Sequence, residues 1–120
     1  SGIASALWYL HCTRQGVIHG DLKPVNVLMD QKRRIPKLAD FGMSQSVRRF
    51  QHWKGYTSAY AAPEVLAHTE TKSPAASDMF SFGCLAYFVL TGKNPNEGLS
   101  KKDITKLAKD GCVASLDWLN

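Results

Sequence analysis

Two short segments contain the side chains best suited to chemistry, H-G-D-L-K-P-V-N at residues 19–26 and D-F-G at residues 40–42. Their two carboxylates and one amide can converge if the residues between the segments form a hairpin. Mg²⁺ prefers hard oxygen ligands and keeps several waters, so one carboxylate and one amide oxygen suffice when phosphate oxygens complete the shell. We therefore predict that Asn26 and Asp40 bind Mg²⁺, which leaves Asp21 free to accept a hydrogen bond from an attacking hydroxyl.

The residues around these segments predict short strands. Residues 25–29 are rich in β-branched side chains, and residues 36–39 form a second apolar run after the polar turn of residues 30–34. This pattern predicts a hairpin, and residues 17–19 predict a further short strand.

The first residues of the chain predict an amphipathic helix. Ile3, Leu7 and Leu10 recur at helical spacing, and the pattern ends near His11. No cluster of capping residues precedes this pattern, so we expect the sequence to begin within or just before a helix of a larger domain.

The second half of the chain predicts a long loop followed by two helices. Residues 42–61 lack sustained periodicity, and loops of that length usually serve a function. Residues 77–90 are apolar nearly all round, which predicts a helix buried on most sides and ended by Gly92. A capping box at residues 100–103 begins the last helix, and Gly111 ends it. The expected fold class is α+β, mainly α, with small β-hairpins.

Composition excludes several classes of protein. The chain has 120 residues, of which 44% are hydrophobic and 21% charged, as in globular domains. Its three cysteines are widely spaced and form no CxxC pair, which argues against a disulfide framework or zinc site. From this cysteine usage we expect a reducing, intracellular setting. No apolar run long enough to span a membrane and no signal-peptide pattern is evident in the sequence. The net charge of +5 comes from short basic clusters without interleaved aromatic residues, so we expect no nucleic-acid partner.

The motifs together resemble the protein kinase family, whose catalytic loop is H-R-D-L-x-x-x-N and whose metal motif is D-F-G. Asp21 matches the catalytic aspartate, while Asn26 and Asp40 match the metal ligands. Residues 62–64 match the A-P-E motif that closes the activation segment. The order and spacing agree throughout, and the resemblance covers about residues 3–111.

The resemblance implies a C-terminal kinase lobe that uses ATP and Mg²⁺ and phosphorylates a protein substrate. Lys23 would contact the γ-phosphate as a second catalytic residue, and Leu28 would join Asn26 and Asp40 in binding the nucleotide. Lys23 before a proline and Thr57 at the substrate site resemble Ser/Thr kinases. The segments F-S-F-G at residues 80–83 and L-T-G-K at residues 90–93 resemble the tyrosine-kinase-like group that includes plant receptor kinases.

The resemblance also implies structural roles. Asp78 would hold the backbone of the catalytic loop, and His19 would pack beneath Phe41 rather than act as an acid or base. Glu64 would pair with an arginine in helices beyond this sequence. We assign no role to the other three histidines, among them His11, because their spacing does not suit metal ligation.

The sequence also departs from the family pattern. Gly20 replaces the usual arginine, which resembles the non-RD kinases and argues against control by activation-loop phosphorylation. Tyr56 stands where the family often has glycine. No G-x-G-x-x-G loop, V-A-I-K lysine or paired glutamate is present, so the N-terminal lobe is absent from residues 1–120. We expect uncovered apolar surface where that lobe and the last helices would pack, and no activity from the isolated chain.

Three interpretations follow from these residues. The first is an enzyme that, when complete, transfers the γ-phosphoryl group of ATP to Ser or Thr. The second is a pseudokinase or interaction module, and the third is a truncated gene product. The retained catalytic groups favour the first, and the sequence upstream of Ser1 would distinguish it from the third.

Overall fold

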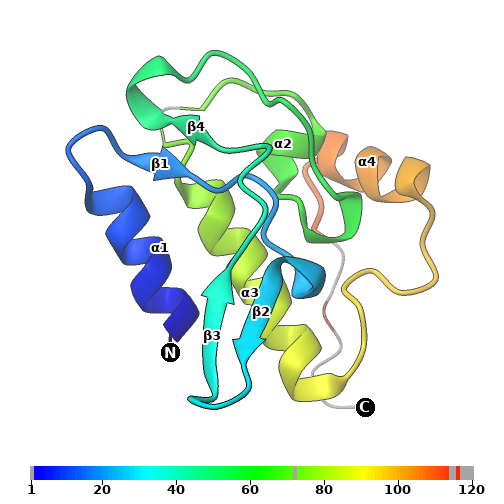
Figure 1. Cartoon of the computed structure of the whole chain (residues 1–120). Coiled ribbons are helices and arrows are strands. Elements are labelled where there is room, and N and C mark those ends of the chain that lie inside the picture. Colours follow the sequence, from blue (N-terminus) through cyan, green and yellow to red (C-terminus); the bar gives the residue numbers. More distant parts are fainter. Residues whose placement is uncertain (1, 72, 114–115, 117–120) are drawn as a thin grey trace.

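The computed structural model of the chain describes residues 2–71, 73–113 and 116. Figure 1 shows α3 passing behind the β2–β3 hairpin, with α1 on one side of the hairpin and α4 beyond α2. The elements in chain order are α1 (Gly2–Cys12), β1 (Val17–Ile18), the 3-10 helix η1 (Pro24–Asn26), β2 (Val27–Asp30), β3 (Ile35–Leu38), β4 (Gln45–Ser46), the 3-10 helices η2 (Val47–Arg49) and η3 (Ser58–Tyr60), α2 (Pro63–Leu66), α3 (Ala76–Thr91) and α4 (Lys101–Lys109).

The predicted hairpin is confirmed. β2 and β3 pair antiparallel, with Val27 opposite Leu38 and Asp30 opposite Ile35. The Asp30 carboxylate accepts hydrogen bonds from the backbone N–H groups of the next turn, and this local bonding favours the reversal of the chain. Because β2 follows η1 directly, the hairpin fixes one end of the segment at residues 19–26.

The predicted first helix is also confirmed, and its apolar stripe enters a core. Ile3 and Leu7 of α1 are buried against Leu22, which follows Asp21, and against Leu85 of α3. Burial of each such side chain contributes about 1.5–3 kcal/mol. This core holds the segment at residues 19–26 between two helices.

A second core joins the short helix α2 to α4. Val65 and Leu66 of α2 pack with Ile104 and Ala108 of α4, and Phe80 of α3 packs against them. The predicted capping box is present, because the Ser100 hydroxyl accepts from Asp103 N and the Asp103 side chain accepts from Ser100 N. α2 has only four residues, which is too short for a periodic pattern to indicate a helix.

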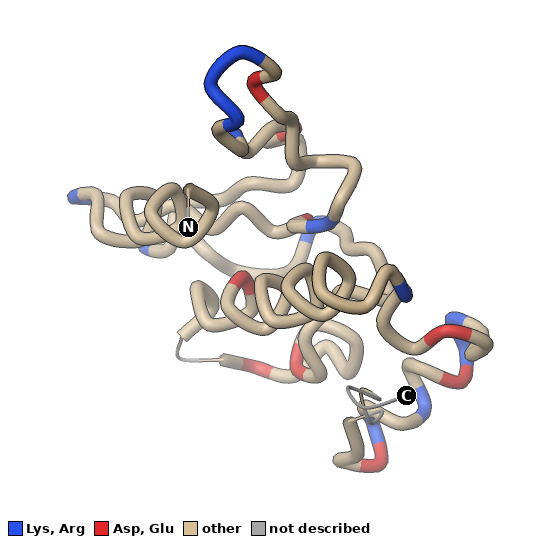
Figure 2. Tube along the Cα trace, turned by 90° about the horizontal axis from the view of Figure 1, so that it is seen from below, with Lys and Arg blue, Asp and Glu red and all other residues tan. Residues whose placement is uncertain are grey.

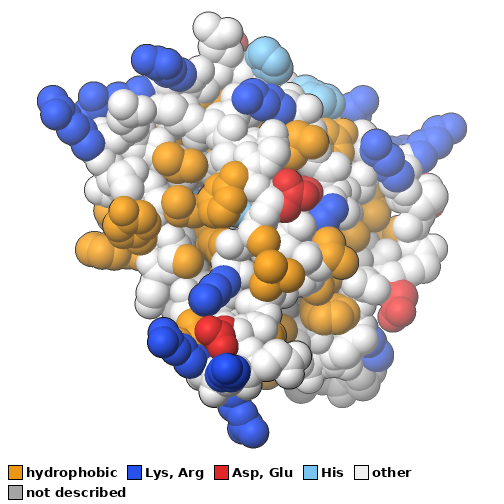
Figure 3. Space-filling view, in the orientation of Figure 1, with side chains coloured by type: hydrophobic (Ala, Val, Ile, Leu, Met, Phe, Trp, Pro, Cys, Tyr) orange, Lys and Arg blue, Asp and Glu red, His pale blue; other side chains and the backbone are white. Residues whose placement is uncertain are grey.

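The position of α3 agrees with the predicted helix, but its predicted burial on most sides is wrong for its last turn. Gly92 ends the helix in the left-handed conformation, with φ 70°. Val89 and Leu90 are exposed, Leu90 by 74%, because α1 and the hairpin pack with Leu85 and Phe82, which lie earlier in the helix. Figure 3 shows other hydrophobic side chains at the surface over α1 and the hairpin. No helix in the described part of the chain has the length and apolar character needed to cross a membrane.

The predicted loop at residues 42–61 contains short elements that periodicity could not indicate. β4 pairs antiparallel with β1, with Val17 opposite Ser46 and Ile18 opposite Gln45. This pairing ties the beginning of the loop to the strand that precedes residues 19–26. The two-residue length of each strand is too short to produce an alternating pattern.

Candidate active site

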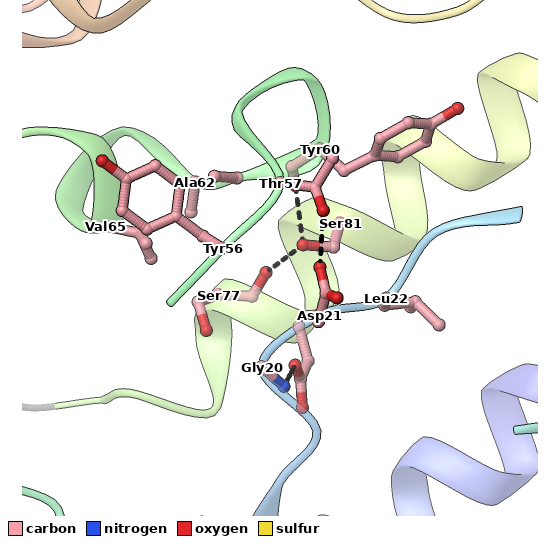
Figure 4. Close-up of a pocket in the computed structure, with 12 residues that line it drawn as sticks. Gly20, Asp21, Leu22, Tyr56, Thr57, Tyr60, Ala62, Val65, Ser77 and Ser81 are labelled. Carbon is pink, nitrogen blue, oxygen red and sulfur yellow. Dashed lines mark hydrogen bonds between the residues drawn. The ribbon is translucent and has the colours of Figure 1, made fainter. Parts of the chain in front are cut away.

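Asp78 supports the backbone of the segment at residues 19–26. It lies in the first turn of α3, where the helix dipole favours a carboxylate, and its side chain is buried. Its Oδ2 accepts from His19 N at 2.8 Å, and its Oδ1 accepts from Gly20 N at 2.9 Å. Figure 4 shows the second of these bonds. The Nε2 of His11 lies 2.9 Å from Oδ2, so one carboxylate connects α1, α3 and the candidate catalytic loop.

His19 is buried, and both ring nitrogens are used in hydrogen bonds. Its Nδ1 accepts from Asp21 N at 3.2 Å, so the ring proton is on Nε2, which donates to Ala39 O at 2.9 Å. The ring packs edge-on against Phe41, with 5.0 Å between the centroids. These contacts occupy His19 in positioning its neighbours and leave it no nitrogen for proton transfer.

Four polar side chains form one connected group around Asp21. The Thr57 hydroxyl donates to Asp21 Oδ1 at 2.8 Å, and Lys23 Nζ donates to Thr57 Oγ1 at 2.7 Å. Lys23 Nζ also lies 3.3 Å from Asp21 Oδ2. Asn26 Nδ2 donates to the backbone oxygen of Asp21 at 2.7 Å. The structure thus brings together Asp21, Lys23, Asn26 and Thr57. Thr57 comes from the long loop and is 36 positions from Asp21 in the sequence.

Figure 4 shows Asp21 and Thr57 facing each other in a small hollow. The hollow is closed on one side by η3, which α3 holds in place. Ser81 Oγ donates to Tyr60 O at 2.7 Å, and the Tyr60 hydroxyl donates to Asn94 Oδ1 at 2.9 Å. Burial, with a smaller contribution from Cys84, raises the pKa of Tyr60 to about 12, so this hydroxyl stays protonated at neutral pH.

Asp40 lies outside this connected group. It is exposed, its φ is 55°, and its Oδ1 accepts from Gly42 N at 3.2 Å. The preceding residue is firmly held, because Ala39 N donates to Asn26 O at 2.9 Å. The described residues therefore anchor the chain on the N-terminal side of Asp40 without bonding its carboxylate to Asp21 or Asn26.

The donor set of Asn26 and Asp40 suits Mg²⁺. The Asn26 amide nitrogen faces Asp21, which leaves its Oδ1 as an oxygen ligand, and Asp40 supplies a carboxylate. No group of three His, Cys, Asp or Glu side chains in the described chain could hold a metal ion. A cation here would take only two side-chain ligands and complete its shell with water and phosphate oxygens, as Mg²⁺ does.

Leu28 and Glu64 lie away from the group around Asp21. Leu28 is on β2 with 58% of its surface exposed, and Glu64 lies in α2. Within the described part of the chain the Glu64 side chain has no hydrogen-bond or ion-pair partner. Their predicted roles in nucleotide binding and in an arginine pair stay predictions.

Sequence reasoning missed two positioning residues. His11 received no role, yet its ring contacts the Asp78 carboxylate. Ser44 Oγ donates to His19 O at 3.1 Å and so joins the long loop to the candidate catalytic loop. Neither contact has a signal in spacing, because the residues are 67 and 25 positions from their partners.

Gly20 occupies a position that suits glycine. Its φ is 84°, and a Cβ built there would lie 2.8 Å from the backbone oxygen of Met43. Residues with a side chain rarely adopt this conformation, and the close approach is to backbone, which cannot rotate away. The backbone conformation at this position therefore suits the glycine that stands where the family usually has arginine.

Comparison with known proteins identifies the family of the chain. The sequence model of the protein kinase domain matches residues 1–118. The chain therefore belongs to the protein kinase family.

Its relatives include receptor-like and serine/threonine kinases. The chain is 39% identical over 110 residues to cysteine-rich receptor-like protein kinase 28 of Arabidopsis thaliana, covering 85% of this chain and 16% of that protein. It is 40% identical over 111 residues to serine/threonine-protein kinase fused of Drosophila melanogaster, covering 89% and 13% respectively. It is 38% identical over 96 residues to receptor-interacting serine/threonine-protein kinase 3 of Homo sapiens, covering 76% and 18%. The chain spans less than a fifth of the length of these relatives.

Proposed function

We propose that this chain is part of the C-terminal lobe of a protein kinase that transfers the γ-phosphoryl group of ATP to Ser or Thr hydroxyls of a protein substrate. The observation that carries the proposal is the bond from the Thr57 hydroxyl to Asp21 Oδ1. This bond supports the proposal because an Asp21 oxygen already accepts a hydrogen bond from a hydroxyl in a hollow at the surface. A substrate hydroxyl can be oriented by the same carboxylate.

The neighbouring side chains support this chemistry. Lys23, whose ammonium group is already beside Asp21, would neutralise negative charge on the transferring group. Asn26 and Asp40 would hold Mg²⁺, which when bound offsets the charge of the nucleotide phosphates. Leu28, exposed on β2, would offer an apolar contact to the nucleotide. Asp78 keeps the loop that carries Asp21 in place and does not touch the substrate.

Two further features favour Ser/Thr as the acceptor and a receptor-kinase-like subgroup. Thr57 bridges Asp21 and Lys23, which is the substrate-site position that the resemblance to Ser/Thr kinases implies. The names of several relatives include serine/threonine or receptor-like kinase.

The test compares Asp21→Asn with Asp40→Asn in the complete kinase domain. We expect Asp21→Asn to lower turnover by about 10²–10⁴-fold and to change Mg-ATP affinity little, because Asp21 acts on the acceptor hydroxyl. Asp40→Asn should abolish metal-dependent nucleotide binding, because the ligand is needed before and during transfer. Binding is measured by titration calorimetry with and without Mg²⁺, and turnover by phosphate transfer to a peptide.

The matched control is Asp110→Asn, an exposed carboxylate at the end of α4 that should leave both quantities unchanged. Equal loss of nucleotide affinity in the Asp21 and Asp40 variants would contradict the division of roles. A complete domain that transfers no phosphate would favour the interaction module. The isolated 120-residue chain should show no transfer above its own Asp21→Asn variant, because it contains no phosphate-covering glycine loop or V-A-I-K lysine.

A further inference from the structure

The outer face of α4 is unusually basic for a helix whose inner face forms a core. Ile104 and Ala108 are buried against α2, while the exposed side is hollowed into a groove. We call it the lysine groove; its main lining residues are Tyr56, Lys101, Lys102, Asp103, Lys106 and Lys109. Figure 2 shows basic positions along α4, apart from the separate basic cluster at the tip of the β2–β3 hairpin.

The charges of the lysine groove are not balanced from within the described structure. It contains four lysines and one carboxylate, that of Asp103. The Asp103 side chain accepts from Ser100 N at 3.2 Å and from Ser100 Oγ at 2.7 Å. These hydrogen bonds lower the pKa of Asp103 and keep it ionised in the capping box. None of the four lysines lies within ion-pair distance of a carboxylate that the structure describes, although the charge of Lys106 helps to lower the pKa of Asp103.

The position of two of these lysines does not favour the helix itself. Lys101 and Lys102 are the first two residues of α4, where the helix dipole is positive. A cation there is less favourable than at the C-terminal end of a helix, so these side chains add to a positive potential without stabilising α4. An anionic group bound in the groove would offset this potential.

Tyr56 connects the lysine groove to the candidate active site. Its side chain lines both the groove and the hollow that contains Asp21 and Thr57. Lys101 Nζ lies 5.5 Å from the centre of the Tyr56 ring, and the His68 ring packs edge-on against it at 6.0 Å. The two sites are thus separated by one side chain that has defined contacts. An extended peptide advances about 3.3–3.6 Å per residue, so a few residues suffice to pass from one site to the other.

We propose that the lysine groove binds acidic side chains of the protein substrate a few residues away from the phosphorylated Ser or Thr. The inference rests on the proposed kinase function and specifies its substrate class. A protein segment is favoured over a nucleic acid because the groove adjoins the acceptor site, and because the other basic cluster lies apart from it at the hairpin tip. A nucleic acid would instead require a continuous basic strip.

The experiment uses the complete kinase domain and pairs of synthetic peptides that contain a single serine. One peptide of each pair has glutamate at positions two to five residues from the serine, on one side or the other, and its partner has glutamine there. We expect kcat/KM to be about tenfold higher for the acidic peptide when glutamate is on the side that reaches the groove, with a preference that weakens at high salt.

The double variant Lys102→Glu with Lys106→Glu should remove or reverse this preference. The matched control is Lys32→Glu with Arg33→Glu, which changes net charge equally at the hairpin tip and should keep the preference. Lys102→Gln with Lys106→Gln provides a second variant without new repulsion in α4, and it should reduce the preference without reversing it. Phosphate transfer without a preference for either acidic peptide, or a preference equally reduced by the control, would overturn the inference and leave the proposed function intact.

A binding measurement separates the two proposals. Fluorescence anisotropy of labelled acidic and glutamine peptides reports on the lysine groove even if no phosphate is transferred. Acidic-peptide binding that depends on Lys102 and Lys106 in an inactive domain would support the groove and contradict the kinase function. Tighter binding of a single-stranded oligonucleotide or of phosphatidylserine vesicles through the same lysines would overturn the assignment of an acidic protein segment.

Discussion

The two halves of the candidate active site are built differently. The loop that carries Asp21 is fixed by buried groups: Asp78 accepts from two of its backbone N–H groups, and His19 connects it to Ala39. Asn26 closes the same loop through its bond to Asp21 O. Each of these bonds lies wholly or partly away from solvent, where an unmade hydrogen bond is costly. This half of the site is therefore organised by the protein itself.

The half that carries Asp40 has much less support. Asp40, Phe41 and Met43 are exposed, and the Asp40 carboxylate has a single local bond to Gly42 N. The positive φ of Asp40 costs about 1–2 kcal/mol in an ordinary residue, although Asp tolerates it better than most. The difference indicates that the half around Asp21 is preorganised by the protein, whereas the half around Asp40 is held by few contacts among the described residues. Under the proposed function, bound nucleotide and Mg²⁺ would supply the remaining order of the Asp40 half.

Alanine substitution of Asp78 and of Asp40 should show the largest difference in stability between the two halves of the site. Asp78→Ala leaves two buried backbone N–H groups and His11 without their acceptor, and it should lower the free energy of unfolding by about 3 kcal/mol. Asp40→Ala removes one exposed local bond and should change stability by less than about 0.5 kcal/mol. Urea denaturation of the complete domain, followed by circular dichroism, gives both values.

The matched control for this pair is again Asp110→Asn, which should behave like Asp40→Ala. Similar destabilisation by Asp78→Ala and Asp40→Ala would show that both halves of the site are equally built into the fold. The proposed difference in organisation would then be wrong.

A smaller effect is expected at Gly20, which lies in the firmly held half. Gly20→Ala places a Cβ 2.8 Å from Met43 O at a φ of 84°, and it should destabilise the domain by about 1–3 kcal/mol. Gly83→Ala is the matched control, because Gly83 lies inside α3 and its Cβ would meet nothing within 4 Å. That change should stabilise the helix by up to about 1 kcal/mol. Thermal unfolding measures both, and a neutral Gly20→Ala would mean that Met43 moves freely.

The sequence predicted the parts of this site that depend on local pattern. The β-branched run and the polar turn at residues 30–34 predicted the hairpin, and the spacing of Ile3 and Leu7 predicted α1. The motif spacing also identified Asp21 and Asn26, which the structure brings into contact. These features are local, so a short window of sequence contains the physical cause of each.

Other features depend on contacts between distant residues and had no such signal. His11 acquires a role only when α3 brings Asp78 to it, and β4 exists only because β1 offers it an edge. The last turn of α3 was predicted to be buried, but Val89 and Leu90 are exposed. An apolar composition does not reveal which elements pack against a helix. The conformation of Asp40 is likewise set by the turn around it, which sequence periodicity does not report.

The smallest effect concerns phosphorylation of the long loop, on which turnover should not depend. A phosphate carries nearly two negative charges and orders a loop when a cationic side chain lies close enough to pair with it. Gly20 has no side chain with which to pair it. The pairing of β1 with β4 already ties the long loop to the strand that precedes residues 19–26.

The hydroxyls themselves support the same expectation. Ser44 donates to His19 O, Ser46 donates to Gln15 O, and Thr57 donates to Asp21. A phosphate on Thr57 would place its charge against the Asp21 carboxylate, which is unfavourable. Three of the four loop hydroxyls considered as phosphorylation sites thus already donate hydrogen bonds within the structure. The fourth is the hydroxyl of Ser58.

The measurement is peptide phosphorylation by the complete enzyme before and after phosphatase treatment, with Ser58→Ala as a separate variant. Arg48 and Arg49 lie in the loop and could pair with a phosphate locally, so Arg48→Gln with Arg49→Gln is the control for that contact. Turnover should differ by less than about twofold in every case, because a local pair would not connect the loop to Asp21. A large loss on dephosphorylation that maps to one hydroxyl would show that another cation replaces the missing arginine, and that the loop is organised by modification rather than by its own backbone.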